Sequence, residues 1–566
     1  MPRTITPGTQ SFAKLRQNNY FYIDKTKFIK EWWNDGIDVT LITRPRRFGK
    51  TLMLDTVNTF FSLEYAGRSD LFEGLEIWKD EEFRNLQGTI PVIFLSFADV
   101  KSEVYSKSME LIKDIIVSTY DIFKPNFDLS LFTDTEKEHL ASVNRSMSDA
   151  TAQTSLRHLA RYVERQYNNA PIILLDEYDS PLHEAWFYKY LDKQIEFLRG
   201  FFNSTFKTNK YIKRALITGI TRIAKESIFS DMNNLEVITT TSVSYSDYFG
   251  FTEQEVFSAM DEYGLTQKKK VKRWYDGFIF GKNKAIYNPW SIINYLQKKE
   301  FFAYWAKSSS NKIVGELILQ SNEDVREDTS ELLKGKSIKT MMEEEFSFSQ
   351  LDEPGVLWSF LMATGYLKPI SFNKEKQQYK LTLTNHEVHL ALDILISNWF
   401  KNSISYNRKF LKALLSDDLE GMNINLNHIT KTVFSFFDTS GNEPERFYHG
   451  FVLGLIVDMK DRYIIKSNRE SGSGRYDVTM FPKRVNDKGI VIEFKTLNYE
   501  NEINIEKTCK NALKQIRKKD YIKELLDNEV ISSKIYVYGF GFHGKDVMIC
   551  GGANDQIDWI DIMKEK

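Results

Sequence analysis

The sequence predicts an α/β protein of several domains that begins with a mostly parallel sheet. The chain has 566 residues, which is enough for roughly four domains of common size. In its first half, short apolar or β-branched runs alternate with stretches long enough for helical crossovers, a pattern typical of a parallel sheet covered on both faces. The expected strands are Val39–Thr43, Pro91–Ser96, Ile172–Leu175 and Ala215–Thr218.

The middle of the chain predicts a helical connecting domain. From about Phe251 to Ile404 the apolar spacing is mainly helical, as in Trp290–Leu296 and Leu357–Ala363. The segment Ser321–Glu345 is polar and dense in charge, so we expect it to be a mobile excursion within this domain.

The carboxyl-terminal part predicts a separate small α/β domain. Its expected elements are a helix at Arg446–Met459, strands at Arg475–Phe481 and Gly489–Lys495, a basic helix from Ile505 and a strand at Ile535–Tyr538. A flexible lead-in at Ser467–Gly474 is expected before the strand pair. We therefore expect domains at residues 1–250, 251–425 and 426–566.

Composition argues against a membrane protein and against a small disulfide-stapled scaffold. Hydrophobic residues make up 42% of the chain, and its apolar runs are much shorter than the roughly 20 residues of a membrane span. The amino terminus has no apolar signal region, so a cytoplasmic location is expected. Cys509 and Cys550 lack Cys or His neighbours, which predicts two buried thiols in a reducing compartment and no structural zinc. The 76 basic and 77 acidic residues nearly balance, so only local clusters indicate a partner.

A strand, a loop and a helix together predict a phosphate-binding site. Val39–Thr43 is followed by Arg-Pro-Arg-Arg-Phe-Gly-Lys-Thr at residues 44–51 and then by a helical run. In such loops backbone N–H groups face the anion, a lysine neutralises it and a hydroxyl reaches Mg²⁺. The residues that fit these roles are Gly49, Lys50 and Thr51.

The loop departs from the usual phosphate-binding pattern in one respect. Arg44 occupies the place of the first glycine, and Arg46 and Arg47 lie within the loop. Taken alone, the segment could also be a basic turn before a helix.

A second apolar strand supports the phosphate-binding interpretation. Ile172–Leu175 ends in Asp176 and Glu177, and such a pair can hold Mg²⁺ through water and orient the attacking water. The alternative is a buried strand that ends in a solvated turn. After another expected strand, Thr218 and Arg222 stand where they could sense a terminal phosphate, although turn residues need no such role.

The carboxyl-terminal strand pair predicts a metal-dependent site. Because side chains alternate along a strand, Glu493 and Lys495 should share one face while Ile492 and Phe494 share the other, and Asp477 can lie opposite the first pair. Phosphodiester hydrolysis needs carboxylates that hold Mg²⁺ and a cation near the developing charge. A surface hairpin with a solvated Glu–Lys pair is the alternative.

A basic helix accompanies this strand pair. Residues 507–519 contain six basic side chains and no acid, with Cys509, Leu513 and Ile516 expected to face inward. Lys510 and Lys514 are the expected contacts to a nucleic-acid backbone, although a solvated helix face would have the same pattern.

Acidic side chains before the strand pair are further candidates for the metal site. Glu445 begins the preceding helix, where it could join the metal ligands or favour the helix dipole. Glu470 is a weaker candidate, and His449 is expected to be packed or hydrogen-bonded.

These motifs together resemble a bacterial family of AAA-ATPase-like proteins with a C-terminal nuclease domain of the PD-(D/E)XK superfamily. The resemblance covers most of the chain and rests on segments 22–25, 43–51, 174–179, 227–230 with 233–235, 274–277 and 287–289 and on Asp477, Glu493 and Lys495. In this family the loop Arg-Pro-Arg-Arg-Phe-Gly-Lys is usual, and Tyr476 replaces the proline of the nuclease pattern.

The resemblance implies a P-loop ATPase domain and a restriction-endonuclease-like α/β domain. ATP and Mg²⁺ are the implied cofactors, with Lys50, Thr51, Asp176 and Glu177 as the implied nucleotide-site residues. Gln515 and Tyr521 resemble a helix motif that accompanies the nuclease core, which adds Gln515 to the expected nucleic-acid contacts.

Two hypotheses follow from the sequence. In the first, the protein is an ATP-regulated, Mg²⁺-dependent nuclease that acts on nucleic acid, with DNA preferred. In the second, it is a nucleotide-dependent switch or scaffold whose C-terminal fold binds nucleic acid or protein without cutting. The presence of Asp477, Glu493 and Lys495 favours the first hypothesis. Neither involves a membrane, and both allow a homo-oligomer.

Overall fold

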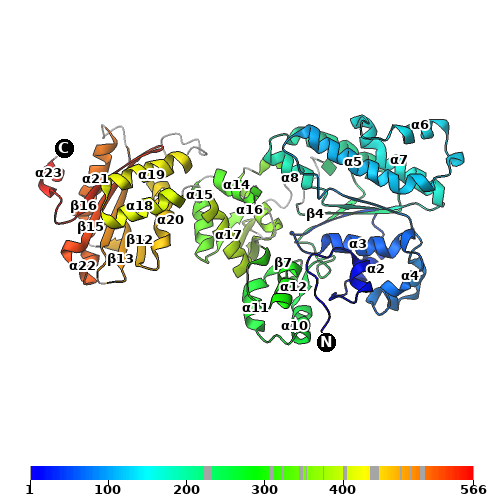
Figure 1. The fold of residues 1–566 in the computed structure, drawn as a ribbon, viewed down its shortest axis with the longest axis horizontal. Helices are drawn as coiled ribbons and strands as arrows, with labels where there is room; N and C mark the ends of the chain where they lie inside the picture. Colours follow the sequence, from blue (N-terminus) through cyan, green and yellow to red (C-terminus); the bar gives the residue numbers. More distant parts are fainter. Residues whose placement is uncertain are drawn as a thin grey trace. The chain divides into compact units, whose positions relative to one another are not determined.

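A computed structural model of the chain divides into two compact units, Met1–Ile394 and Leu395–Lys566. Figure 1 colours the chain from blue at the amino terminus to red at the carboxyl terminus. The described residues are 2–221, 228–229, 232–305, 312–321, 323–342, 348–351, 353–373, 375–399, 404–433, 445–471, 474–484, 486–497 and 504–564. The three-domain division expected from the sequence stays a prediction.

The first unit contains a five-stranded sheet in the order β2-β3-β4-β1-β5, and all its strand pairs are parallel. β1 and β3 are buried along their whole length, because helices cover both faces of the sheet; Figure 1 shows α3 on one side and α5 and α7 on the other. The four expected strands are confirmed. The sequence analysis missed β5, which has only four residues. The bounds are β1 Val39–Thr43, β2 Val92–Ser96, β3 Ile172–Asp176, β4 Arg214–Gly219 and β5 Leu235–Ile238.

The helices around this sheet connect its strands as the alternating sequence pattern predicts. Their bounds are α1 Phe12–Gln17, α2 Lys27–Asn34, α3 Lys50–Phe61, α4 Glu81–Leu86, α5 Tyr105–Phe123, α6 Asp134–Ser142, α7 Asp149–Tyr167, α8 Ser180–Phe187 and α9 Leu191–Phe206. The core between α3 and the sheet is rich in aromatic rings, among them Phe60, Phe61 and Phe72.

The region expected to be a helical connecting domain also contains two small antiparallel sheets, with strand orders β6-β8-β7 and β10-β11-β9. β6 and β7 have only two and three residues, too few to show a clear period, whereas β10 and β11 are longer and the sequence analysis missed them. Their bounds are β6 Phe251–Thr252, β7 Phe278–Phe280, β8 Asn283–Tyr287, β9 Ile338–Met341, β10 Leu367–Asn373 and β11 Gln378–Leu383. The helices are α10 Glu253–Glu262, α11 Lys268–Tyr275, α12 Pro289–Lys298, α14 Lys312–Gln320, α15 Glu323–Leu333, α16 Pro354–Ala363 and α17 His386–Trp399.

The expectation of a mobile excursion at Ser321–Glu345 is wrong over most of that segment. It contains α15 and β9, and Val325, Leu332 and Ile338 are buried. These few apolar side chains anchor the segment despite its high charge.

The second unit is built on one mixed sheet in the order β12-β13-β14-β15-β16, in which β14 and β15 are parallel and the other pairs antiparallel. The strands are β12 Tyr463–Ser471, β13 Gly474–Pro482, β14 Gly489–Thr496, β15 Ile535–His543 and β16 Asp546–Ala553. The helices are α18 Ile404–Ser416, α19 Leu419–Val433, α20 Glu445–Ile456, α21 Ile505–Lys519, α22 Lys523–Asp527 and α23 Trp559–Lys564. The segment Ser467–Gly474 was expected to be flexible. This expectation is wrong up to Ser471, because these residues belong to β12.

Two glycines of β15 allow α21 to lie directly on the sheet. A Cβ atom at Gly539 would be 2.4 Å from the Cys509 carbonyl oxygen, and one at Gly541 would be 2.9 Å from the Ile505 carbonyl oxygen. Both distances are shorter than the contacts that Cβ atoms make in proteins, so a side chain at either position would push α21 away. The intervening aromatic residues Tyr538, Phe540 and Phe542 lie in the core on the other side of the sheet.

The prediction of two free thiols is wrong, because Cys509 and Cys550 form a disulfide with a Cα–Cα distance of 6.1 Å. α21 and β16 bring them together from positions 41 residues apart, which their spacing did not indicate. The cysteines therefore no longer support the expectation of a reducing compartment. Among the described residues, no helix combines the length and apolar character needed to cross a membrane.

Candidate functional site

The loop between β1 and α3 holds Lys50 beside a cavity of about 580 Å³. Gly49 has φ +80°, a backbone conformation that favours glycine, at the position just before α3. The Lys50 ammonium donates to the carbonyl oxygens of Arg44 at 2.9 Å and Pro45 at 3.0 Å. Burial lowers the pKa of Lys50, against the opposing effect of the nearby carboxylates Glu177 and Asp176.

Asp176, the last residue of β3, connects this strand to β4 and to the first turn of α3. Its carboxylate accepts hydrogen bonds from the hydroxyls of Thr51 at 2.7 Å and Thr218 at 2.6 Å. Because β4 lies between β1 and β3 in the sheet, Thr218 reaches the same carboxylate as Thr51. Burial raises the pKa of Asp176, although both hydroxyls favour its charged form.

Glu177 follows β3 in the left-handed backbone region, with φ +51°. This conformation costs energy for a residue other than glycine and turns the chain sharply into α8. Its carboxylate accepts a hydrogen bond from the Ser180 hydroxyl at 2.9 Å. Glu177 lines the same cavity as Lys50 and Thr51. Arg222 lies outside the described residues.

Residues far apart in the sequence form the rest of the cavity wall. The amino-terminal segment contributes Thr6, Gly8 and Tyr22, and the region after β5 contributes Tyr248 and Trp290. A cavity of this volume with mixed polar and apolar lining is typical of a small-molecule site.

Asp179 is a residue of this site to which sequence reasoning assigned no role. Its carboxylate accepts hydrogen bonds from the backbone N–H groups of Ile220 and Thr221, both at 2.9 Å, and from the Thr221 hydroxyl at 2.8 Å. Although burial alone would raise the pKa, bonds from His183 and Thr221 hold the pKa of Asp179 well below its usual range. Asp179 therefore ties the turn that carries Glu177 to the end of β4. The signal in the sequence was the second aspartate of Asp-Glu-Tyr-Asp at residues 176–179.

The arginines of the loop anchor it to neighbouring segments. Arg44 is fully buried, and burial lowers the pKa of its guanidinium to about 9. The guanidinium donates a hydrogen bond to the Thr239 carbonyl oxygen at 2.7 Å. It also lies over the Phe280 ring, 4.8 Å from the ring centre. The Arg46 carbonyl oxygen accepts from the side chains of Asn288 and Trp305, both at 3.3 Å. The missing first glycine is thus replaced by a residue that fixes the loop from outside the cavity.

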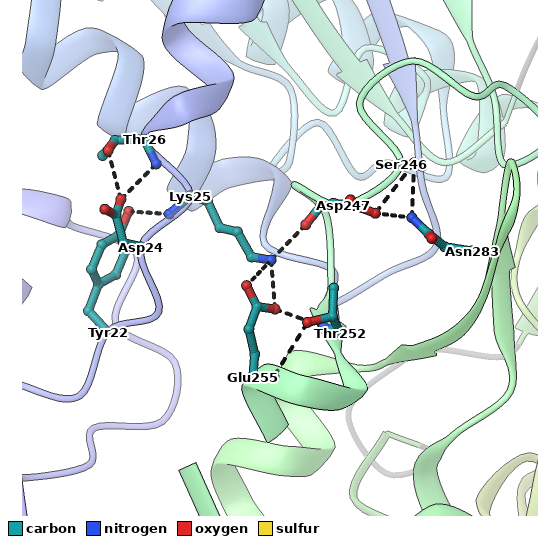
Figure 2. Close-up of polar contacts among 9 residues, drawn as sticks. All are labelled: Tyr22, Asp24, Lys25, Thr26, Ser246, Asp247, Thr252, Glu255 and Asn283. Atoms are coloured by element: carbon teal, nitrogen blue, oxygen red, sulfur yellow. Dashed lines mark hydrogen bonds and ion pairs between the residues drawn. The ribbon is translucent and has the colours of Figure 1, made fainter. Parts of the chain in front are cut away.

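The segment 22–25 joins the amino terminus to the region after β5, as Figure 2 shows. Asp24 accepts hydrogen bonds from the backbone N–H and the hydroxyl of Thr26, before α2. The Lys25 ammonium binds both carboxylate oxygens of Glu255 at 2.6 and 2.7 Å and the carbonyl oxygen of Asp247 at 2.6 Å. Since Lys25 also lines the cavity, this half-buried ion pair holds the cavity wall to α10.

In the second unit, β14 presents Glu493 and Lys495 on the face covered by α21. They are register partners of Gly539 and Gly541 of β15, the two glycines on which α21 packs. Ile492 and Phe494 lie in the core on the other face. The alternation predicted from the sequence is therefore confirmed, although no functional role follows from it alone.

Glu493 is buried, with only 1% of its surface exposed. Its Oε1 accepts a hydrogen bond from the Gln515 side-chain amide of α21. The same amide nitrogen lies 3.3 Å from the Tyr521 hydroxyl. Gln515 thus contacts a candidate metal ligand, which the sequence pattern did not indicate.

The remaining residues of this site are described only in part. β13 carries Asp477, one residue before Val478, which pairs with Ile492 of β14, so the backbone brings it next to Glu493. Glu445 is the first residue of α20. The side chains of Asp477, Glu445, Glu470 and His449 lie outside the description. Within the described part of the chain, no group of three or more His, Cys, Asp and Glu side chains forms a ready metal site.

The basic helix α21 packs as its sequence pattern predicts. Cys509, Leu513 and Ile516 are buried against the sheet. Lys510 and Lys514 are half-buried, and Lys510 forms an ion pair with Glu506 at 3.3 Å.

Two family models match parts of the chain that contain the candidate sites. Residues 6–229 match the profile of a predicted AAA-ATPase family, and residues 443–551 match that of the PD-(D/E)XK nuclease superfamily. The chain carries an AAA-ATPase-like domain and a PD-(D/E)XK superfamily domain. The first match includes the Lys50 loop and Asp176, and the second includes Glu493 and α21.

A curated relative is similar over most of the chain. Over 540 residues the chain is 25% identical to an uncharacterized protein in the vnfD 5′ region of Azotobacter chroococcum mcd 1, covering 91% of this chain and 92% of that protein. This relative extends the similarity across both domains without adding an activity.

Two solved structures from Aeropyrum pernix are similar to part of the chain. The ORC2 protein, in ADPNP–ADP complexes, is 10% identical with a TM-score of 0.24, over 66% of this chain and 93% of that one. The ORC1 protein in complex with DNA is 10% identical with a TM-score of 0.26, over 67% and 94%. At these TM-scores neither likeness bears on function.

Proposed function

We propose that the first unit binds and hydrolyses ATP with Mg²⁺ and that this activity controls a Mg²⁺-dependent nuclease in the second unit, with DNA as its substrate. The observation that carries the proposal is the convergence of Thr51 and Thr218 on Asp176, next to a cavity that Lys50, Thr51 and Glu177 line. We also propose the domain limits 1–250, 251–425 and 426–566 for these parts.

The residues of the cavity suit a nucleotide with a metal ion. Mg²⁺ prefers hard oxygen ligands, and Thr51 and Asp176 offer a hydroxyl and a carboxylate that are already hydrogen-bonded to each other. Lys50 would exchange its two loop carbonyls for phosphate oxygens. Thr218 would keep Asp176 oriented, and Glu177 would orient the attacking water. Bound Mg²⁺ would neutralise charge on the phosphates.

The second site suits phosphodiester cleavage. Asp477 and Glu493 would hold Mg²⁺, with Glu445 as an additional candidate ligand, and Lys495 would stabilise the developing negative charge. Gln515 supports this role for Glu493, because its amide already orients the carboxylate. Lys510 and Lys514 would contact the nucleic-acid backbone.

The decisive experiment is a cleavage assay. Purified protein is incubated with duplex and single-stranded DNA and RNA, with and without Mg²⁺ and ATP, beside Glu493→Ala at matched bound substrate. We expect Mg²⁺-dependent cleavage of DNA by the wild type only. Tight binding without cleavage under Mg²⁺, Mn²⁺ and ATP would favour the switch or scaffold instead.

A further inference from the structure

Helix α11 carries a concentration of positive charge that the acids of the fold balance only in part. Its sequence Lys-Lys-Lys-Val-Lys-Arg-Trp-Tyr places cations at five of its first six positions. Val271 and Tyr275 are buried and Trp274 packs beside them, whereas Lys269, Lys270, Lys272 and Arg273 are exposed to solvent.

The nearby acids balance only part of this charge. Lys268 forms an ion pair with Asp261 at 2.7 Å, and Lys272 pairs with Glu253 and Asp276. The exposed side chains Lys269, Lys270 and Arg273 take part in none of the ion pairs formed among the described residues. We name these three the α11 basic strip.

The α11 basic strip opposes the stability of its own helix. Lys269 and Arg273 are four positions apart, where like charges repel on a helix surface. Lys269 and Lys270 also lie in the first turn, which has no acidic residue and where the helix dipole disfavours cations. A polyanion laid along the strip would remove both costs.

Aromatic side chains lie beside the strip. The Lys270 ammonium is 4.3 Å from the centre of the Phe301 ring, and Trp274 packs at 5.8 Å from the same ring. Trp274 also meets the His386 ring edge-on at 4.6 Å, and burial, together with Arg273, lowers the pKa of His386. His386 is therefore a poor source of additional positive charge, and the strip consists of permanent cations.

We propose that the α11 basic strip is a sequence-independent contact for the phosphate backbone of nucleic acid, in the unit that does not contain Glu493. The choice of nucleic acid as the polyanion rests on the proposed function. A contact on each of the two units would make binding bivalent, which raises affinity without new chemistry. The strip would thus hold DNA to the ATPase-containing unit whether or not the nuclease site cuts it.

The test measures DNA binding by the full-length protein in EDTA, so that cleavage does not interfere. The variant Lys269→Ala/Lys270→Ala/Arg273→Ala is compared with Lys107→Ala/Lys193→Ala/Lys210→Ala, which removes the same charge from exposed sites elsewhere on this unit. The salt dependence of duplex affinity is followed by fluorescence anisotropy. For the α11 variant we expect the log–log slope to fall by about 0.9 for each lost phosphate contact, or up to about 2.7; the control variant should keep the wild-type slope.

A second readout separates binding from folding. Removal of the repulsion should offset the loss of the Lys270–Phe301 contact, so the thermal unfolding midpoint of the α11 variant should stay close to that of the wild type. Its ATP hydrolysis should continue at the wild-type rate. A wild-type slope in the α11 variant, or an equal fall in the control, would overturn the proposal. So would a loss of binding to phosphatidylserine vesicles with unchanged DNA affinity. If the slopes are as expected but the wild-type protein cleaves no DNA, the proposed nuclease activity would be wrong and the proposed DNA contact of α11 would stand.

Discussion

Lys50 is a buried cation whose present partners are two backbone carbonyl oxygens. Neither carbonyl oxygen carries a formal charge, whereas a buried lysine with a structural role is more often paired with a carboxylate. The Lys50 ammonium is therefore suited to bind an anionic ligand. The same cavity edge carries Glu177 in a strained backbone conformation. Both residues therefore have features that folding alone does not require.

We predict that Lys50→Ala weakens ATP binding at least about tenfold, because a charge-assisted hydrogen bond contributes roughly 1.5–3 kcal/mol. Isothermal titration with Mg²⁺-ATP measures this, and Lys107→Ala on the exposed surface of α5 serves as control. Equal affinity in wild type and Lys50→Ala would contradict the assignment of this loop.

Glu177→Gln should keep ATP binding but slow hydrolysis by roughly 100-fold or more, in the range expected for loss of a general base. The substitution preserves the shape and leaves Asp176 in place as the metal ligand. Steady-state phosphate release, measured at saturating ATP, checks the rate. Turnover at or above the wild-type rate would show that Glu177 does not orient the attacking water.

At the scale of elements, the approach of α21 to β15 sets the geometry of the second site. Gly539 and Gly541 leave room for the helix backbone, and the helix brings Gln515 to Glu493. The position of Glu493 therefore depends on two residues with no functional group.

Gly539→Val should destabilise the second unit by about 1–3 kcal/mol through overpacking and should reduce cleavage, because α21 must move away from β14. Denaturant unfolding and the cleavage assay measure the two effects. Gly454→Ala is a matched control, since a Cβ atom there meets nothing within 4 Å. Unchanged stability of Gly539→Val would mean that α21 does not pack as described.

Glu387 joins α17 to α12 and to Trp305, which contacts the loop at residues 44–51. Its carboxylate accepts the Trp305 backbone N–H and the Ser291 hydroxyl, both at 2.7 Å, and the Trp305 indole in turn reaches the Arg46 carbonyl oxygen. Burial raises the pKa of Glu387 from 4.5 to about 7. Between these two values the folded state binds a proton that the unfolded state has lost, so this group lowers stability as the pH rises.

Glu387→Gln should therefore be more stable than the wild type above about pH 7, by up to roughly 3 kcal/mol, and should resemble it near pH 4.5. Urea unfolding across this range measures the difference, with the exposed Glu375→Gln as control. Parallel pH profiles for wild type and Glu387→Gln would rule out this buried carboxyl as the cause.

At the scale of the whole molecule, the two candidate sites lie in separate compact units. Lys50, Asp176 and Glu177 belong to the first unit, and Glu493 and Lys495 belong to the second. Their chemistry should therefore be separable by mutation.

We predict that Asp477→Ala, Glu493→Ala and Lys495→Ala each lose cleavage while ATP hydrolysis continues at about the wild-type rate. Each variant removes a group from one unit and leaves the other unit's core intact. Parallel cleavage and phosphate-release assays on the same preparations check this. Loss of both activities in all three folded variants would indicate one shared site instead.

The sequence by itself determined the parallel sheet, the phosphate loop, the acids after β3 and the alternation in β14. Local patterns carry this information, because the strand period and the loop order depend on neighbouring residues alone. It also pointed to the inward face of α21 through helical spacing. These features needed no knowledge of which strands pair.

Only the tertiary structure decided which distant residues meet. Thr218 reaches Asp176 because β4 lies between β1 and β3, and Gln515 reaches Glu493 because two glycines admit α21. The Cys509–Cys550 disulfide and the anchoring of the phosphate loop by Asn288 and Trp305 are of the same kind. Such contacts depend on strand order and packing between remote segments, which no local pattern of residues encodes.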